Sequence, residues 1–428
     1  MNKRPFAISP RAAARVRFAA ILGVLGPGLV SGFADNDAGG ITTYSVAGVK
    51  YGYELLWVLL ATQIILFFTQ EVGARLGLAT GQGLTGLVRE RFGVRWVTFL
   101  TITMLIANIG SIVAEFAGTA AALSLFGIEN HAISAALAAG VVIILLTRGS
   151  FSKVQYLFVA VGIGVSLAYL ASALLAKPDW GLAASSLVIP RGSFSAAYWL
   201  AVVATVGTTI TPWGQAFIQS YCADKRLGPE DLVGERVDVG LGALLTNLIA
   251  AFIVVACASG LAAHGVHIDT NDPNAISQIA KALAPLAGEG ATMLFAVGLL
   301  AASFLGLGVV PLTSAYAACE AFGWETGVDW RWREAPAFYG LLVFFIVFAA
   351  LFVLIPGLPL VEVMFMAQVI NALLLPFVLV FVMLLASDEK LMGPLVSGRV
   401  LKTIGWTGTG LLVALSLTLA WSSFFASA

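Results

Sequence analysis

Long apolar stretches alternate with short polar loops along almost the whole chain. A helix that crosses a bilayer needs about 20 mostly apolar residues, because each residue adds about 1.5 Å to its length. By this measure the pattern predicts about eleven transmembrane helices, and an all-α integral membrane protein, in the ranges 18–48, 53–77, 97–126, 132–147, 154–176, 198–221, 239–263, 291–318, 338–356, 360–386 and 403–425.

Two of these predicted helices contain polar stretches that disfavour a helix. In the first, "SGFADNDAGG" (31–40) places Asp35, Asn36 and Asp37 directly before two glycines. In the sixth, "GTTITPWGQ" (207–215) contains Pro212, which has no backbone donor. An unpaired backbone group in hydrocarbon costs several kcal/mol, so a helix breaks at membrane depth only where the break lines a cavity or is buried in protein.

The two breaks lie five predicted helices apart. This spacing predicts an inverted five-plus-five repeat of the LeuT type, with broken helices 1 and 6 and a substrate between them near the bilayer midplane. We expect an N-terminal segment (1–17), a first repeat (18–176), a second, inverted repeat (198–387) and an additional C-terminal helix (403–425). A simple kink at Pro212 is the alternative for the second break.

The composition supports a membrane protein and excludes other classes. Hydrophobic residues make up 59% of the 428 residues, charged residues make up 11%, and the mean hydropathy is +0.95. A soluble domain carries far more charge. The net charge is +0 and the basic residues are dispersed among loops, so we expect no nucleic-acid partner. The sequence contains no catalytic triad or phosphate-loop motif, so we expect neither an enzyme nor a cofactor.

Lysine and arginine occur mainly near the N-terminus and in alternate loops. Examples are "RERFGVR" (89–95), "DKRLGPEDLVGER" (224–236) and "DEKLMG" (388–393), which follow the second, sixth and tenth predicted helices. Because basic loops stay in the cytoplasm, we expect a multi-pass protein of the plasma (inner) membrane. Its N-terminus should be cytoplasmic and its C-terminus outside.

Asp37 is the residue that the sequence most favours for function. A carboxylate near the bilayer centre costs roughly 3 kcal/mol, so it normally faces a cavity, an ion or a partner. Apolar chain on both sides places Asp37 near mid-depth, and the first helix offers no basic residue to neutralise it. A cation is therefore the expected partner. Asp35 lies about 200° away around a helix, which suits a gate or a cap.

These residues resemble the natural-resistance-associated macrophage protein (Nramp) family of divalent metal transporters, in a divergent bacterial form. The resemblance implies a secondary transporter that moves a divalent metal by alternating access in a lipid bilayer. The matching segments are "GPGLVSGFADNDAGGITTYSVAGVKYGYELLW" (26–57), "AEFAGTAAALSLFGI" (114–128), the Thr211-Pro212 break and "AQVINALLLPFVLVFVMLLASDEKLMG" (367–393).

The resemblance also implies a set of metal ligands. These would be the carboxylate of Asp37, the backbone carbonyls of Ala34 and Thr208, the side chain of Thr211 and, as an accessory ligand, Gln368.

Two family ligands are replaced in this chain. The first-helix motif Asp-Pro-Gly-Asn reads Asp37-Ala38-Gly39-Gly40, so the asparagine ligand is lost, and Asn36 could supply an amide instead. The sixth-helix motif Met-Pro-His reads Thr-Pro-Trp, so a hydroxyl replaces a thioether. Thioethers favour softer transition metals, whereas oxygen ligands suit Mg²⁺ and Mn²⁺. We therefore expect a hard divalent ion.

The family's proton pathway is largely missing. Ile112, Trp213 and Ile218 occupy positions where typical members have an aspartate and two histidines, and the ninth helix has no basic residue. Glu115 is retained, so Glu115 and Asp35 are the candidate gate or proton sites. We expect weak or no proton coupling.

Two other functions remain open at this point. One is a carrier for an organic, amino acid-type substrate with the same architecture, and the other is a non-transporting membrane metal sensor.

Overall fold

The computed structural model describes residues 26–148, 151–265, 268–272, 274–327 and 330–425. The predicted N-terminal segment 1–17 and the predicted start of the first helix, 18–25, lie outside these ranges. Within them the chain forms helices and loops and no strand. The fold class predicted from the sequence, an all-α protein, is therefore confirmed.

The α-helices are α2 (Pro27–Ala34), α3 (Ala38–Tyr51), α4 (Leu56–Thr80), α5 (Leu84–Phe92), α6 (Val94–Leu125), α7 (His131–Thr147), α8 (Phe151–Leu175), α9 (Trp180–Val188), α10 (Ala196–Thr209), α11 (Pro212–Asp224), α12 (Leu232–Gly260), α13 (Ala275–Ala280), α14 (Ala284–Ala287), α15 (Ala291–Phe322), α16 (Pro336–Phe352), α17 (Leu360–Ala386), α18 (Glu389–Met392) and α19 (Arg399–Phe425). Short 3₁₀ helices are η1 (Pro229–Asp231), η2 (Ala262–His264), η3 (Lys281–Leu283), η4 (Gly288–Gly290) and η5 (Gly393–Leu395).

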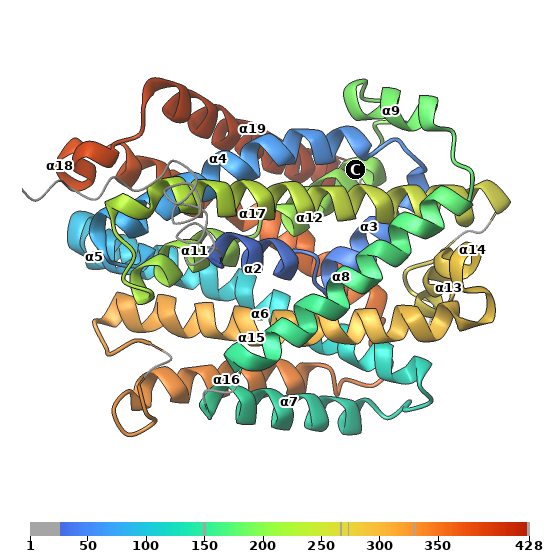
Figure 1. The fold of residues 1–428 in the computed structure, drawn as a ribbon, viewed down its shortest axis with the longest axis horizontal. Helices are drawn as coiled ribbons and strands as arrows, with labels where there is room; N and C mark the ends of the chain where they lie inside the picture. Colours follow the sequence, from blue (N-terminus) through green and yellow to red (C-terminus); the bar gives the residue numbers. More distant parts are fainter. Residues whose placement is uncertain (1–25, 149–150, 266–267, 273, 328–329, 426–428) are drawn as a thin grey trace, which may run out of the picture.

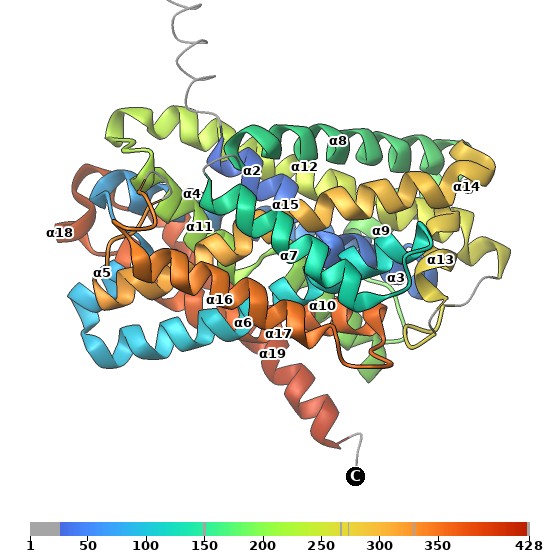
Figure 2. The same cartoon turned by 90° about the horizontal axis from the view of Figure 1, so that it is seen from below.

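The long helices run roughly along the long axis of the molecule (Figure 1, Figure 2). Helix α6 packs along α15 and α17, and α12 packs against α2, α3 and α4. Both views place α5 and α18 at one end and α9, α13 and α14 at the other. The two ends of the bundle are therefore distinct, and we call them the α5 end and the α9 end.

Helices occupy each of the eleven predicted ranges. In the described residues, six of them are long and apolar enough to cross a membrane, and α7 and α16 are shorter apolar helices. Many large apolar side chains on the bundle are exposed, among them Ile144, Phe344 and Leu411, as lipid-facing surfaces require. The total number of membrane crossings stays a prediction.

Both predicted helix breaks are present. Helix α2 ends at Ala34 and α3 begins at Ala38, while α10 ends at Thr209 and α11 begins at Pro212. Asp37 and Thr211 cap the restarted helices with their side-chain oxygens. Proline suits the first position of a helix because its missing N–H would have no partner there. A simple proline kink, the alternative for the second break, is therefore wrong.

Several segments that the sequence analysis assigned to basic loops are helical. The stretch 89–95 spans the end of α5 and the start of α6, 232–236 belongs to α12, and 389–392 forms α18. A hydropathy measure counts only apolar stretches, but a helix continues through charged residues whose side chains reach solvent or form ion pairs. Arg91 pairs with Asp388 in this way, across the α5 end.

Glycines bring the half-helices into backbone contact with their neighbours. A Cβ added at Gly28 or Gly32 of α2 would collide with the backbone of α12 at Val239 and Gly242. A Cβ at Gly207 of α10 would collide with a carbonyl of α17. Glycine has no Cβ, so these pairs of helices approach more closely than other residues would allow. Both breaks are thus held deep in the bundle.

Candidate functional site

Three polar residues at the first break are buried in the protein. Asp35, Asn36 and Asp37 are 1%, 7% and 2% exposed. Asp37 Oδ1 accepts a hydrogen bond of 2.6 Å from the backbone N–H of Gly40, at the N-terminus of α3. Because the first N–H groups of a helix have no intrahelical partner, the Asp37 carboxylate caps the start of α3.

The second break faces the first through Thr211. The Thr211 hydroxyl accepts from the backbone N–H of Gly214 at 3.1 Å and donates to Asp35 Oδ1 at 3.2 Å. The Thr211 hydroxyl oxygen thus caps α11 and links it to Asp35, the residue that follows α2. The sequence analysis named Thr211 and Asp35 as separate candidates, one at each break, and did not predict this hydrogen bond, since contacts between distant segments leave no local signal.

Three oxygens converge on the backbone at Gly40. A Cβ built there would lie 2.8 Å from the backbone carbonyl oxygen of Asp35, 3.1 Å from Thr208 Oγ1 and 3.4 Å from Asp37 Oδ1. In the described structure the Thr208 hydroxyl is buried and no protein group pairs with it. The resemblance implied a carbonyl ligand from Thr208, and the structure adds its side-chain oxygen to the candidate donors.

Gln368 of α17 reaches the same place from the other side. A Cβ at Gly39 would collide with Gln368 Nε2, so the missing side chain makes room for this amide. Gln368 Oε1 accepts a 2.9 Å hydrogen bond from Asn371, which is also bonded to Ser111. In this orientation the amide nitrogen faces Gly39, and Gln368 would have to turn its amide over to offer oxygen to a cation. Asn371, missed by sequence reasoning, holds that orientation.

Two further predicted ligands, Asn36 and Ala34, lie at the first break itself. The Asn36 amide donates to the carbonyls of Gly32 and Thr246, both at 3.4 Å. Since Thr246 belongs to α12, the Asn36 side chain faces α12 and not Gly39 and Gly40. Ala34 is the last residue of α2 and is fully buried. Carbonyls at a helix C-terminus have no intrahelical donor, which leaves the Ala34 carbonyl available at the break.

Glu115 of α6 completes the group of buried acids. It is 0% exposed, and its Oε2 accepts a 3.4 Å hydrogen bond from the backbone N–H of Ala38. In the described part of the chain, no Lys or Arg forms an ion pair with Asp35, Asp37 or Glu115. Three buried carboxyl groups without a basic partner make a strongly cation-favouring environment.

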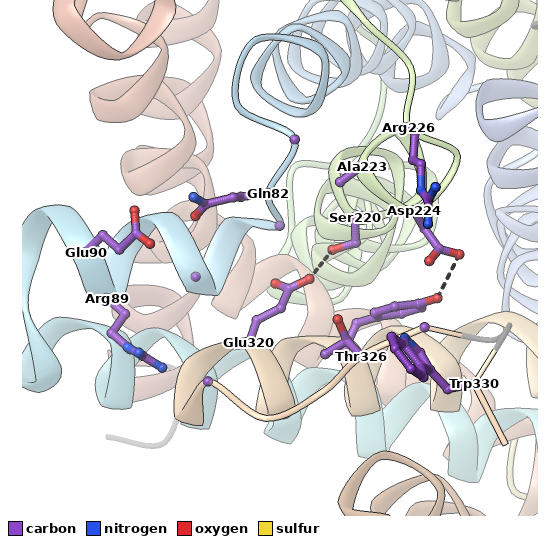
Figure 3. Close-up of a pocket in the computed structure, with 16 residues that line it drawn as sticks. Gln82, Arg89, Glu90, Ser220, Ala223, Asp224, Arg226, Glu320, Thr326 and Trp330 are labelled. Carbon is purple, nitrogen blue, oxygen red and sulfur yellow. Dashed lines mark hydrogen bonds between the residues drawn. The ribbon is translucent and has the colours of Figure 1, made fainter. Parts of the chain in front are cut away.

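A polar cavity of about 580 Å³ lies at the α5 end of the bundle. Gln82 and Arg89, Ser220 and Arg226, and Trp330 line it from three different parts of the chain (Figure 3). Arg89 and Arg226 belong to two of the basic segments, 89–95 and 224–236, that the sequence analysis placed on one side of the membrane. The structure brings these two segments together.

Comparison with known proteins identifies the family. Residues 28–422 match the family described as natural resistance-associated macrophage protein-like, Nramp. The chain belongs to the Nramp family. It is 29% identical over 425 residues to a divalent metal cation transporter MntH of Burkholderia ambifaria, covering 96% of this chain and 91% of that one. With MntH of Bacillus subtilis it shares 27% over 443 residues, covering 99% and 100%. These Nramp relatives are transporters, in agreement with the expectation that the chain is not an enzyme.

Solved structures agree on the fold. The manganese transporter of Eremococcus coleocola, crystallised with a bis-isothiourea compound, superposes with a TM-score of 0.77 at 21% identity, covering 96% of this chain and 89% of that one. MhsT in complex with L-phenylalanine gives 0.64 at 15% identity, covering 95% and 98%. At such identities the likeness shows a shared fold alone. The fold class predicted from the sequence is thereby confirmed.

The residues at the positions where the resemblance led us to look for a proton pathway are buried in this Nramp chain. Ile112, Trp213 and Ile218 are each 0% exposed, so the positions expected to hold the proton pathway are apolar or aromatic and fully buried. Glu115, which the sequence analysis named as the retained acid of that pathway, lies beside Gly306 of α15.

Proposed function

We propose that this chain is a secondary transporter of a divalent metal cation and works by alternating access around the breaks of α2–α3 and α10–α11. The observation that carries the proposal is the buried Asp37 at the N-terminal end of α3. Thr208, Gln368 and Asp35 surround the two glycines that follow it, at positions 39 and 40. A buried carboxylate of this kind normally faces an ion or a partner. The MntH names of the Nramp relatives support the same class of substrate.

The transported ion that we propose is hard, Mg²⁺ or Mn²⁺. The candidate ligands at the site are carboxylate, hydroxyl, amide and carbonyl oxygens, which suit such ions. Within the described ranges, no cluster of three or more His, Cys, Asp or Glu side chains has the arrangement of a metal site. A site with few protein ligands leaves positions for water, and Mg²⁺ usually keeps several waters when bound.

We propose further that the α5 end is cytoplasmic, with an N-terminus inside and a C-terminus outside. The cavity in Figure 3 brings together Arg89 and Arg226 from two of the basic segments, and basic segments stay inside. The five-plus-five division into residues 18–176 and 198–387, followed by 403–425, belongs to the same proposal.

The alternatives are less well supported. A carrier for a free amino acid would have to place the substrate carboxylate beside Asp35 and Asp37, with no ion-paired base near them in the described structure. Like charges in a low-dielectric interior repel strongly. Nothing in the described structure points to signal transmission by a sensor.

The test is ion flux into proteoliposomes loaded with a metal-sensitive dye. Asp37→Ala should reduce Mg²⁺ and Mn²⁺ flux to the level of empty vesicles, because it removes the carboxylate at the break. Asp37→Asn keeps a capping oxygen for α3 and should lose flux as well. Titration calorimetry with Mg²⁺, Mn²⁺, Ca²⁺ and Cd²⁺ on the same proteins would establish the preferred ion.

Asp179 supplies a matched control, since its Oδ1 caps α9 through the N–H of Leu182 at 2.9 Å, in an exposed position. Asp179→Asn should leave flux unchanged. Undiminished flux in both Asp37 variants would refute the assigned site.

A further inference from the structure

A line of polar side chains extends from the second break toward the cavity at the α5 end. Thr211, Gln215 and Gln219 recur every four residues on α11, so they share one face of the helix. Gln215 and Gln219 are 1% and 0% exposed. Gln219 Nε2 donates to the carbonyl of Gln82 at 3.0 Å, and Gln82 lines the cavity (Figure 3). The line therefore ends at the cavity wall.

Helix α2 contributes two polar groups to the same line. A Cβ at Gly214 would lie 3.5 Å from Ser31 Oγ and 3.6 Å from Asp35 Oδ1, which places both oxygens next to α11. Gln70 of α4 donates to Ser31 Oγ at 3.2 Å. Side chains from α2, α4 and α11 thus enclose the first part of the line, beside the Thr211 hydroxyl.

Helices α4 and α11 are in close contact along the second part. Added Cβ atoms at Gly73 and Gly77 of α4 would lie 3.3 Å and 2.7 Å from the carbonyls of Gln215 and Gln219. The backbone of α11 at Gln215 and Gln219 is therefore covered by α4, and both residues are buried between the break and the cavity.

These side chains carry polar atoms that no protein group satisfies. Among the residues with described positions, Gln215 has no partner for either its oxygen or its nitrogen, and neither Gln70 Oε1 nor Gln219 Oε1 accepts a hydrogen bond. Asp35 Oδ2 is unpartnered as well. Buried polar side chains are nearly always paired with protein or water. Several unpaired polar atoms along one face of α11 therefore indicate that water or an ion occupies the space beside them.

We infer that Gln215 and Gln219, together with Ser31 and Gln70, form the route by which the cation passes between the broken helices and the α5-end cavity. This inference rests on the proposed transport function. Amide and hydroxyl oxygens can replace part of the ion's hydration shell, yet as neutral groups they hold it weakly enough to let it leave. Gln215 is the first of these side chains on α11 beyond Thr211, and it controls the rate of passage.

The experiment compares flux with binding in single variants. Gln215→Leu keeps the approximate size of the side chain and removes its polar atoms, so initial Mg²⁺ flux in proteoliposomes should fall about tenfold. The dissociation constant for Mg²⁺, measured by calorimetry, should change by less than about twofold, because Gln215 is no ligand of the Asp37 site. Gln215→Asn retains an amide and should keep most of the flux.

Gln278 provides the matched control for the same chemical change. It lies on α13, at the α9 end, where its amide donates to Asp272 at 3.3 Å. Gln278→Leu should leave both flux and binding unchanged. Native flux in Gln215→Leu, or an equal loss of flux and affinity, would overturn the inference. Absence of both flux and binding in the native chain would instead refute the proposed function.

A second measurement does not depend on the folding of Gln215→Leu. In a chain whose three native cysteines, Cys222, Cys257 and Cys319, are replaced, Gln215→Cys should react with a small water-soluble thiol reagent. Saturating Mg²⁺ should slow that reaction, since ion and reagent share the route. A cysteine at this position that stays unreactive in folded, ion-transporting protein would contradict the route.

Discussion

At the scale of single residues, the unexpected finding is the hydrogen bond between the side chains of Thr211 and Asp35. The Thr211 oxygen already accepts from Gly214 and donates its proton to Asp35. A hydroxyl can accept a second bond, so Thr211 retains one position for a cation. The replacement of a family methionine by threonine therefore changes more than the softness of a ligand, because the hydroxyl also caps α11 and joins the two breaks.

Thr211→Met is expected to raise the affinity for Cd²⁺ relative to Mg²⁺ by about tenfold, or about 1.4 kcal/mol, because a thioether favours softer metals. It should also lower stability by about 1 kcal/mol through loss of the helix cap. Competition titrations and thermal unfolding measure the two effects. Thr211→Ser keeps the hydroxyl and should change neither. An unaltered Cd²⁺/Mg²⁺ ratio in Thr211→Met would mean that position 211 does not face the ion.

The role of a residue could be predicted from the sequence where neighbouring residues in the chain indicate it, and not where it depends on contacts with distant residues. Asp37 and Thr211 were recognisable from glycine, proline and charge within an apolar stretch, and the structure places both at helix starts. The direction of Asn36 toward α12 and the orientation of Gln368 depend on Thr246 and Asn371, which are distant in sequence. Side-chain direction of this kind follows from tertiary packing, for which a single sequence gives no pattern.

At the scale of elements, the half-helix α2 is attached to α12 at its N-terminal end. The carboxylate of Asp238 accepts hydrogen bonds from the backbone N–H groups of Gly26 at 3.0 Å, Gly28 at 2.5 Å and Leu29 at 3.3 Å. The first N–H groups of a helix have no intrahelical partner. A residue from another helix thus supplies the cap that α2 lacks in its own sequence, where Gly26 holds the N-cap position.

Asp238→Ala should loosen α2 from α12, because it leaves these N–H groups without an acceptor. The expected loss of stability is about 1–2 kcal/mol, with faster hydrogen exchange over residues 26–34. Exchange measured by mass spectrometry on the purified protein tests this. Asp238→Asn retains one acceptor oxygen and should show a smaller effect. Equal protection of 26–34 in native protein and Asp238→Ala would show that the carboxylate does not hold the half-helix.

At the scale of the whole molecule, the lengths of the apolar stretches located the long helices, because a membrane requires long apolar segments. The ends were predicted less well. Helix α12 begins at Leu232, before the predicted start at 239, since Glu235 and Asp238 lie inside the helix and not in a loop. Those charges are buried against neighbouring helices, and their partners come from elsewhere in the chain.

Ion transport by this chain is expected to be weakly coupled or uncoupled to protons. Coupling needs a titratable group that responds to the metal and a polar route for the proton, but Ile112, Trp213 and Ile218 are buried where the family pattern places such groups. The measurement is internal pH in dye-loaded proteoliposomes during Mg²⁺ influx under a membrane potential. Internal pH should stay constant. Acidification in fixed proportion to influx, abolished by Glu115→Gln, would establish the pathway that we expect to be absent.

Gly28 and Gly32 of α2 contact α12 through backbone atoms. Helices usually pack by fitting ridges of side chains on one helix into grooves of the other, and a glycine contributes no side chain to such a ridge. The two ends of α2 are instead tied to other helices by hydrogen bonds, at Asp238 and between Thr211 and Asp35. Any pivot of α2 against α12 would therefore have to break these hydrogen bonds or carry their partners along.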